Sequence, residues 1–241
     1  MDVEIMAIGN VTPDSFYAAS RRETEEAIAR WAEDSVSAGA AILDIGACST
    51  RPGSKPVDSD TEWKRLSGAL TIVRSVAGQT RLSIDTFRPG IARAAIDTFG
   101  PMIINDISGG DETMYQTVRA YGVPYIWTLR GDLTLPARQK MEGIDLILDP
   151  GFGFIGSVEK DYECLRRMDT LRQFGKPVLV GVSRKSMIYK PLGLTPETCL
   201  TATQAIHLYA LEHGATILRT HDVAATAETV MLYNQINVNN N

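Results

Sequence analysis

Apolar runs that end in polar residues recur along this chain. Seven stand out: IMAIGN, AILDIGACSTR, RLSIDTFR, MIINDISGG, LILDPGFGF, VLVGVSRKS and TILRTHD. Runs so rich in Val, Ile and Leu are typical of strands that are buried on both faces of a parallel sheet. Between them, apolar residues recur at spacings of three and four, which is the pattern of amphipathic helices. We therefore predict alternating strands and helices.

The number of these units favours a closed barrel. A further strand is expected near residues 124–129, which brings the total to eight, and 241 residues fit the typical barrel length of about 250. We predict an α/β fold, a single (β/α)8 TIM barrel over residues 1–236, with a polar tail at 237–241. The expected strands lie near residues 4–10, 41–47, 81–86, 102–107, 124–129, 145–150, 177–182 and 216–221.

One unit of the barrel departs from this pattern. Between the fifth and sixth expected strands, RGDLTLPARQKMEG has only weak helical periodicity and contains Pro136. Proline interrupts a helix because it lacks the backbone N–H and clashes with the preceding turn. The fifth outer helix is therefore predicted to be truncated or missing, which would leave an exposed apolar patch beside it.

Catalytic groups of such barrels lie at the carboxyl ends of the strands. The side chains of Asp85, Asn105 and Asp149 end three apolar runs, and two carboxylates and an amide suit a flat heterocycle with N–H donors and a carbonyl. Such groups need partners, because an unpaired buried polar group costs about 1–3 kcal/mol. The strand endings expected to form one site are Asn10, Asp44, Thr50, Arg51, Asp85, Asn105, Asp149, Lys185, Arg219 and His221.

A structural alternative exists for the three heterocycle residues. Asp85 could pair with Arg88, and Asp106 rather than Asn105 could face inward. Asp149 could begin a turn through the proline that follows it. All three alternatives together are a weaker explanation than one shared pocket.

Cationic side chains gather at other strand ends. Arg51 can hold a phosphate through a bidentate contact while Thr50 donates a hydrogen bond. Arg219 and His221 alternate along one strand, so both should point the same way. With Lys185 between them and the heterocycle, these residues predict a pocket for an anionic leaving group.

Asn10 ends the first expected strand, and its side-chain carbonyl is a hard oxygen ligand that suits magnesium. Purely structural interpretations of these residues stay open as well. Asn10 and Asp14 could cap a turn, Arg51 could be a surface residue, and His221 could be a structural hydrogen-bonding group.

Composition limits the remaining function classes. A net charge of -5, a pI near 5.3 and the lack of a long basic run argue against a nucleic-acid or membrane surface. Cys48, Cys164 and Cys199 lack CxxC spacing, which argues against a zinc site or a disulfide framework. Neither a signal-peptide pattern nor an 18-residue apolar span is present, so we expect a cytoplasmic protein.

Seven motifs, in their order along the chain, resemble the signature segments of the dihydropteroate synthase family of pterin-binding barrels. They are NVTPDSF, DIGACSTRPG, SIDTFR, INDISGG, LDPGFGF, VGVSRKS and ILRTHDV, and they span roughly residues 5–230. The resemblance implies condensation of a dihydropterin pyrophosphate with p-aminobenzoate, which gives dihydropteroate and pyrophosphate for folate synthesis. It also implies magnesium as the cofactor, a homodimer and a sulfonamide target.

The resemblance also implies roles for particular residues. The pterin would be held by Asp85, Asn105, Asp149 and Lys185. The pyrophosphate would be bound by Thr50, Arg51, Arg219 and His221, with magnesium on Asn10. The p-aminobenzoate pocket would be shaped by Pro52, Phe154, Lys185 and Ser186. The catalytic residues would be Asp85, Lys185, Arg219 and His221.

The mechanism implied by the resemblance is dissociative. Pyrophosphate leaves first, and the arylamine then attacks the pterin methylene cation. Neutralising the leaving group lowers the barrier to bond cleavage, and a carboxylate near the ring tolerates the developing positive charge.

Three segments depart from the family pattern. Where the family often has MH-M-x-G, this chain has WTLRG, without the histidine. Residues 155–157 replace a common Gly-Lys-Thr/Asn, and the first loop lacks Asp-Gly-Gly. These departures leave a catalytically impaired pterin-binding paralogue as an alternative. A methyltetrahydrofolate:corrinoid-type methyltransferase is a second alternative, but it would not need the STRPG, SRKS and RTHD cations together.

Overall fold

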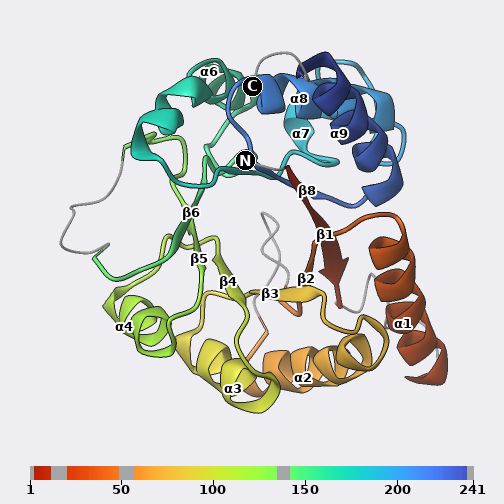
Figure 1. The fold of residues 1–241 in the computed structure, drawn as a ribbon, viewed down its shortest axis with the longest axis vertical. Helices are drawn as coiled ribbons and strands as arrows, with labels where there is room; N and C mark the ends of the chain where they lie inside the picture. The colour runs from red at the N-terminus through yellow and green to blue at the C-terminus, as the bar shows by residue number, and fades with distance from the viewer. Residues whose placement is uncertain (1–2, 12–20, 49–56, 135–141, 238–241) are drawn as a thin grey trace.

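Eight parallel strands form a nearly closed (β/α)8 barrel, as predicted (Figure 1). The computed structural model describes residues 3–11, 21–48, 57–134 and 142–237. Strands pair in the order β6-β5-β4-β3-β2-β1-β8-β7, and a parallel bridge between Leu148 and Val178 links the two outer strands. The strands are β1 Glu4–Asn10, β2 Ile42–Gly46, β3 Arg81–Asp85, β4 Ile103–Asp106, β5 Tyr125–Thr128, β6 Leu146–Asp149, β7 Leu179–Val180 and β8 Ile217–Thr220.

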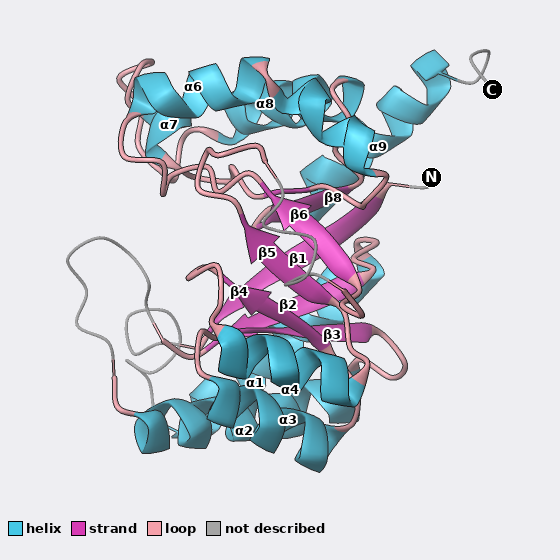
Figure 2. Ribbon diagram, turned by 90° about the vertical axis from the view of Figure 1, so that its left-hand side faces the viewer, coloured by secondary structure: helices cyan, strands magenta, loops and turns pink. Residues whose placement is uncertain are grey.

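Helices surround the barrel, with α1 to α4 on one side and α6 to α9 on the other (Figure 2). In the part of the chain that the structure describes, none combines the length and apolar character needed to cross a bilayer. The α-helices are α1 Arg21–Ser37, α2 Ser59–Val76, α3 Pro89–Phe99, α4 Glu112–Tyr121, α6 Val158–Arg166, α7 Ser186–Tyr189, α8 Leu200–Glu212 and α9 Val223–Asn237. After β6, the helical segment of residues 158–174 divides into α6 and the 3-10 helix Met168–Phe174.

Local sequence signals fix several helix ends. The carboxylates of Asp58 and Asp111 accept the backbone N–H groups of Thr61 and Met114, which caps α2 and α4. Gly122 follows α4 in the left-handed conformation that favours glycine. Thus the ends of these helices are encoded by the residues that flank them.

The fifth unit differs from the others, as the sequence predicts. Between β5 and β6, none of the described residues 129–134 and 142–145 is helical, while 135–141 lie outside the described residues. Leu129 and Leu133 are buried, so the non-helical residues at the start of this connection pack their side chains into the core. The expected apolar patch does not appear there: the exposed large apolar side chains within the described ranges all lie between Leu192 and Ile236.

Side chains inside the barrel form two layers. Alternation along a strand sends every second residue to the same face. The lower layer is apolar and buried, and it comprises Met6, Ile42, Ile103, Ile126, Ile147, Leu179 and Ile217. Two residues further along six of these strands come Asp44, Asn105, Thr128, Asp149, Gly181 and Arg219. The strands therefore place a polar layer on an apolar floor, as expected for a filled barrel interior.

Candidate active site

A pocket opens above the apolar layer, at the carboxyl ends of the strands. The side chains and backbone that line it belong to Asp85, Asn105, Ile107, Thr128, Asp149, Phe154, Gly181, Lys185 and Arg219. Six of these, Asp85, Asn105, Asp149, Phe154, Lys185 and Arg219, are residues that the sequence predicts for the site. Strands β3, β4, β6 and β8 supply four of the six, because the last or next-to-last residue of each strand is a polar residue that lines the pocket.

Arg219 lies between two carboxylates. Its Nε donates to Asp44 Oδ2 at 2.7 Å, and its Nη2 lies 2.6 Å from that oxygen and 3.1 Å from Asp85 Oδ2. The same Asp44 oxygen accepts a hydrogen bond from Asn105 Nδ2 at 3.0 Å, and Asp44 is fully buried. Asp44 therefore fixes two pocket residues from below without lining the pocket itself. The sequence places Asp44 at the site but does not indicate this role.

The Asp85 carboxyl has a strongly raised pKa. Burial raises the pKa of the Asp85 carboxyl to about 7, and the positive charge of Arg219 opposes that rise. The neighbouring carboxylates of Asp44 and Asp106 push the pKa upward. Desolvation disfavours the charged form of an acid, and a second negative charge does the same. A positive charge developing nearby would favour the ionised form.

Lys185 lines the same pocket as Asp85 and Asp149 and feels the negative charge of both. Its Nζ donates to the carbonyl oxygen of Phe152 and lies 4.6 Å from the centroid of the Phe154 ring. Burial lowers the pKa of Lys185 to about 8, while the carboxylate of Asp149 opposes the shift. Burial also raises the pKa of Asp149, and Lys185 opposes that change. These two groups therefore support each other's charged forms.

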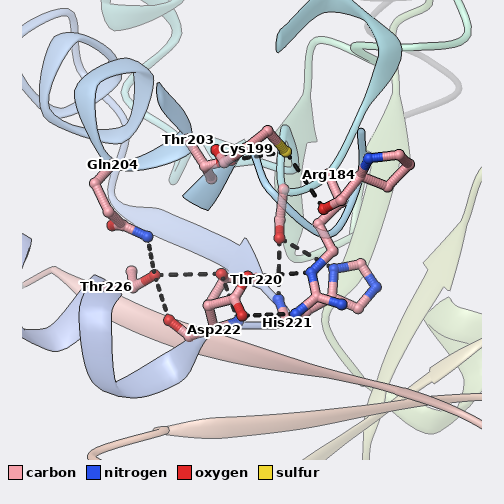
Figure 3. Close-up of polar contacts among 10 residues, drawn as sticks. Arg184, Cys199, Thr203, Gln204, Thr220, His221, Asp222 and Thr226 are labelled. Carbon is pink, nitrogen blue, oxygen red and sulfur yellow. Dashed lines mark hydrogen bonds and ion pairs between the residues drawn. The ribbon is translucent and has the colours of Figure 1, made fainter. Parts of the chain in front are cut away.

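Three further predicted residues, His221, Ser186 and Asn10, are not among those that line the pocket. His221 Nδ1 is 3.0 Å from Ser183 Oγ, and the His221 backbone N–H donates to the same hydroxyl at 3.2 Å. Ser186 is the first residue of α7. Asn10 ends β1, in register with Gly46. Figure 3 shows His221 in a polar network that runs from the loop after β7 to α9.

Gly46 brings Asn10 close to Asp85. A Cβ at Gly46 would lie 3.3 Å from the Cβ of Asp85 and 3.5 Å from Asn10 Oδ1. A larger side chain would therefore separate the amide from the carboxylate. The other predicted residues, Thr50, Arg51 and Pro52, together with Asp14, lie outside the described residues.

Comparison with known proteins agrees with this geometry. The family model of pterin binding enzymes matches residues 6–142 and 134–221. Dihydropteroate synthase of Streptococcus pyogenes serotype M3 is 33% identical over 96% of this chain and 95% of its own length. The chain belongs to the dihydropteroate synthase family.

Solved structures of this family superpose on the barrel. The dihydropteroate synthase of Clostridium difficile, determined in the presence of pteroic acid, has a TM-score of 0.89 at 31% identity, over 98% of this chain and 97% of its own. The Xanthomonas albilineans dihydropteroate synthase with 4-aminobenzoic acid has a TM-score of 0.86 at 33% identity, over 98% and 93%. These matches favour a synthase over a corrinoid-type methyltransferase.

The structure decides between a pocket role and a purely structural role for Asp85, Asn105 and Asp149. Arg88 pairs with Glu62 instead of Asp85, so the proposed Asp85–Arg88 pair is wrong. Asn105 lines the pocket, whereas the Asp106 carboxylate accepts hydrogen bonds from Tyr125 Oη at 3.0 Å and the Ser108 N–H at 2.8 Å.

Asp149 combines the two roles that the sequence leaves open. Its Oδ1 accepts the backbone N–H of Gly151 at 2.9 Å, which shapes the turn after β6. The same residue lines the pocket. The turn therefore holds the carboxylate in place for a ligand.

The altered end of β5 keeps a polar group in the synthase pocket. Trp127 faces the outer helices, and its ring stacks on that of Tyr115 with centroids 5.0 Å apart. Thr128 points the other way, lines the pocket, and donates to the carbonyl oxygen of Asp106 at 3.2 Å. Alternation from the buried Ile126 would have indicated Thr128 as a lining residue. Gly181 follows the buried Leu179 by two residues in the same way, whereas lining by Ile107, beyond the end of β4, has no comparable signal in the sequence.

Proposed function

We propose that this enzyme of the dihydropteroate synthase family condenses 6-hydroxymethyl-7,8-dihydropterin pyrophosphate with p-aminobenzoate to give 7,8-dihydropteroate and pyrophosphate in folate biosynthesis. The observation that carries the proposal is one pocket in which Asp85, Asn105 and Asp149 face the cations Lys185 and Arg219. Such a pocket suits a substrate with a hydrogen-bonding heterocycle at one end and an anion at the other. Relatives of known structure contain pteroic acid or 4-aminobenzoic acid, which supports the same substrates here.

The heterocycle lies against the strand-borne residues. The Asp149 carboxylate, held by the Gly151 N–H, accepts the N–H donors of the pterin. The Asn105 amide, held by Asp44, offers both a donor and an acceptor. Ile107 and the Phe154 ring supply apolar contact at the rim. Because these groups are held before substrate arrives, little ordering is needed on binding.

The reaction proceeds by departure of pyrophosphate before attack by the arylamine. Lys185, Arg219 and His221 stabilise the leaving group through charge and hydrogen bonds, together with Thr50 and Arg51, which follow β2 in the sequence. The ionised Asp85 carboxylate beside the ring stabilises the methylene cation. Phe154, Pro52 and Ser186 shape the p-aminobenzoate pocket and limit the access of water to the cation.

Asn10 is proposed to hold magnesium. Its Oδ1 approaches Gly46 at the mouth of the barrel, and the nearby Asp85 is engaged by Arg219. One neutral oxygen fits Mg²⁺, which keeps several waters and takes substrate phosphate oxygens as ligands. Within the described ranges, no group of three or more His, Cys, Asp or Glu side chains forms a metal site, which also fits a weakly held ion. Bound magnesium would neutralise charge on the pyrophosphate.

A homodimer is also proposed, through the outer face of α8 and α9. Large apolar side chains exposed on these two helices are Leu200, Tyr209, Met231, Leu232 and Ile236. Three of them, Met231, Leu232 and Ile236, lie close together near the end of α9, and a group of this kind is typical of a protein interface. We further propose a cytoplasmic location, since the cysteines Cys48, Cys164 and Cys199 are free and buried. Sulfonamide binding would follow from the p-aminobenzoate pocket.

The test of this function is pyrophosphate release by the purified protein. Dihydropterin pyrophosphate and magnesium are supplied with and without p-aminobenzoate, and dihydropteroate is measured in parallel. We expect dihydropteroate and pyrophosphate in equal amounts when both substrates are present. Binding of the pterin pyrophosphate without dihydropteroate formation would refute the proposal and favour an impaired paralogue, the alternative suggested by the altered loops.

A further inference from the structure

Two site residues outside the regular strands are joined through their neighbours. Lys185 follows β7 and His221 follows β8, and adjacent to them are Arg184 and Asp222. Arg184 Nη2 donates to Asp222 Oδ1 at 2.7 Å and Arg184 Nε donates to Asp222 Oδ2 at 3.2 Å. This fork-to-carboxylate contact fixes orientation as well as distance (Figure 3).

The backbone at Arg184 is in an unfavourable conformation. Its φ angle is 57°, in the left-handed region that normally takes glycine or asparagine. An arginine that is held there points to a contact that compensates for the strain. The residues on either side of Arg184 have different partners: Ser183 contacts His221, and Lys185 donates to the carbonyl oxygen of Phe152.

Asp222 is itself anchored on the opposite side. Its backbone N–H donates to Thr220 Oγ1 at 3.1 Å, and its carbonyl accepts from Thr226 Oγ1 at 2.9 Å. Thr226 Oγ1 also lies 3.2 Å from Thr220 Oγ1 and accepts from Gln204 Nε2 at 3.4 Å. The backbone of Asp222 therefore belongs to a partly buried polar network that ties β8 to α8 and α9, and this network holds the residue that carries the carboxylate (Figure 3).

We propose that Arg184 and Asp222 are positioning residues for the reaction: their ion pair holds the loops after β7 and β8 together, so that Lys185 and His221 act on one substrate. This inference rests on the function proposed above. Arg184 is 40% exposed and Asp222 20% exposed, and pairs this exposed add little to stability. The ion pair between Arg184 and Asp222, here called the clamp, therefore affects the geometry of the site more than the stability of the fold.

The test compares Asp222→Asn and Arg184→Gly with Asp169→Asn. Asp222→Asn removes the charge at constant shape, while Arg184→Gly removes the pair and also relieves the backbone. Asp169→Asn is the control, because it breaks the exposed Arg172–Asp169 pair, at 3.2 Å, on the outer surface. We expect kcat to fall about tenfold or more in both clamp variants, with Tm close to that of the parent protein, and no change in the control.

The pH profile separates positioning from a structural role. Lys185 faces Asp85 from β3, Asp149 from β6, Arg219 from β8 and Asp161 from α6. A lysine released from this pocket regains water, so its pKa rises toward its usual value. The alkaline limb of kcat/KM should therefore move to higher pH in both clamp variants. The proposal would be overturned if the alkaline limb kept its position and the loss of activity matched the loss of folded protein.

A double variant completes the test. If the two residues act through one contact, Asp222→Asn combined with Arg184→Gly should be no slower than the worse single variant. Additive losses, or parental kcat in either single variant, would contradict the clamp. The parent protein is assayed first: failure to form dihydropteroate there would refute the proposed function, whereas normal parent turnover with unaffected variants would refute the clamp alone.

Discussion

The two sides of the pocket are built in different ways. On one side, Asp85, Asn105 and Asp149 belong to strands β3, β4 and β6, and the barrel itself aims them inward. On the other side, Lys185 and His221 lie beyond the ends of β7 and β8. Contacts between loops hold these two in place. The barrel thus provides a rigid receptor for the heterocycle, whereas the residues for the leaving group depend on tertiary contacts.

Arg219 joins the two sides, and its removal should have the largest effect. Arg219→Ala eliminates a cation of the leaving-group side and leaves Asp44 buried without its ion-pair partner. We expect loss of detectable turnover and a decrease of about 3–5 kcal/mol in the free energy of unfolding. Urea denaturation and a dihydropteroate assay measure the two effects. Undiminished stability would show that Asp44 does not need Arg219.

Lys185→Ala should affect catalysis without the same loss of stability. The ammonium contacts a carbonyl oxygen and an aromatic ring at the pocket entrance, so no buried carboxylate is left without its hydrogen bonds. We expect kcat to fall by about 10²–10³, as for loss of a group that stabilises transition-state charge. Steady-state kinetics and thermal unfolding are compared with those of Arg219→Ala. If kcat stays within about threefold of the parent value, Lys185 has no role in the mechanism.

The pH dependence tests both sides at once. The carboxyl of Asp85, with its pKa raised to about 7, is ionised above that pH, and Lys185, with its pKa lowered to about 8, is protonated below that pH. Turnover needs both charged forms, so kcat/KM should rise toward pH 7 and decline above pH 8. Asp85→Asn should abolish the acid limb of whatever activity remains. An unchanged acid limb in that variant would assign it to another group.

Asp149→Asn should have a moderate effect on binding of the heterocycle. The substitution keeps the shape and one acceptor but removes the charge that receives the pterin donors. We expect an affinity for the pterin pyrophosphate about tenfold weaker, equal to about 1.4 kcal/mol. Isothermal titration calorimetry measures the affinity of both proteins for the pterin pyrophosphate. Equal affinity would place the pterin elsewhere in the barrel.

Thr128→Val should give the smallest change. Valine keeps the volume and removes the hydroxyl that donates to the carbonyl oxygen of Asp106 at 3.2 Å. The hydroxyl also lowers the pKa of Asp149 and so supports the ionised form that receives the pterin donors. A neutral hydrogen bond contributes about 0.5–1.5 kcal/mol, so a loss of pterin affinity of about threefold to tenfold is expected by calorimetry. No change would mean that Thr128 only fills space at the pocket floor.

The sequence predicts the strand-borne side well for a physical reason. A strand that is buried on both faces gives a long apolar run, and its inward position is set by alternation. Asn105, Asp149 and Arg219 each follow an inward isoleucine by two residues, which places them in one layer. The apolar runs nevertheless exceed the strands: β7 has only Leu179–Val180 of the predicted 177–182.

The contacts that orient the site could not be predicted from local pattern. Asp44 bonds to Asn105, 61 positions away, and to Arg219, 175 positions away. The pairing of Arg184 with Asp222 spans 38 positions. Alternation shows which way a side chain points, but only the closed barrel shows which partner it meets.

Ligand binding with and without the pyrophosphate tests the division of the pocket most directly. The affinities of 6-hydroxymethyl-7,8-dihydropterin and of its pyrophosphate are measured by calorimetry for the parent protein, Asp149→Asn and His221→Ala. We predict that Asp149→Asn weakens both ligands by the same factor, whereas His221→Ala weakens only the pyrophosphate. Equal losses for both ligands in His221→Ala, or a loss confined to the pyrophosphate in Asp149→Asn, would contradict a pocket with one side for the pterin and the other for the leaving group.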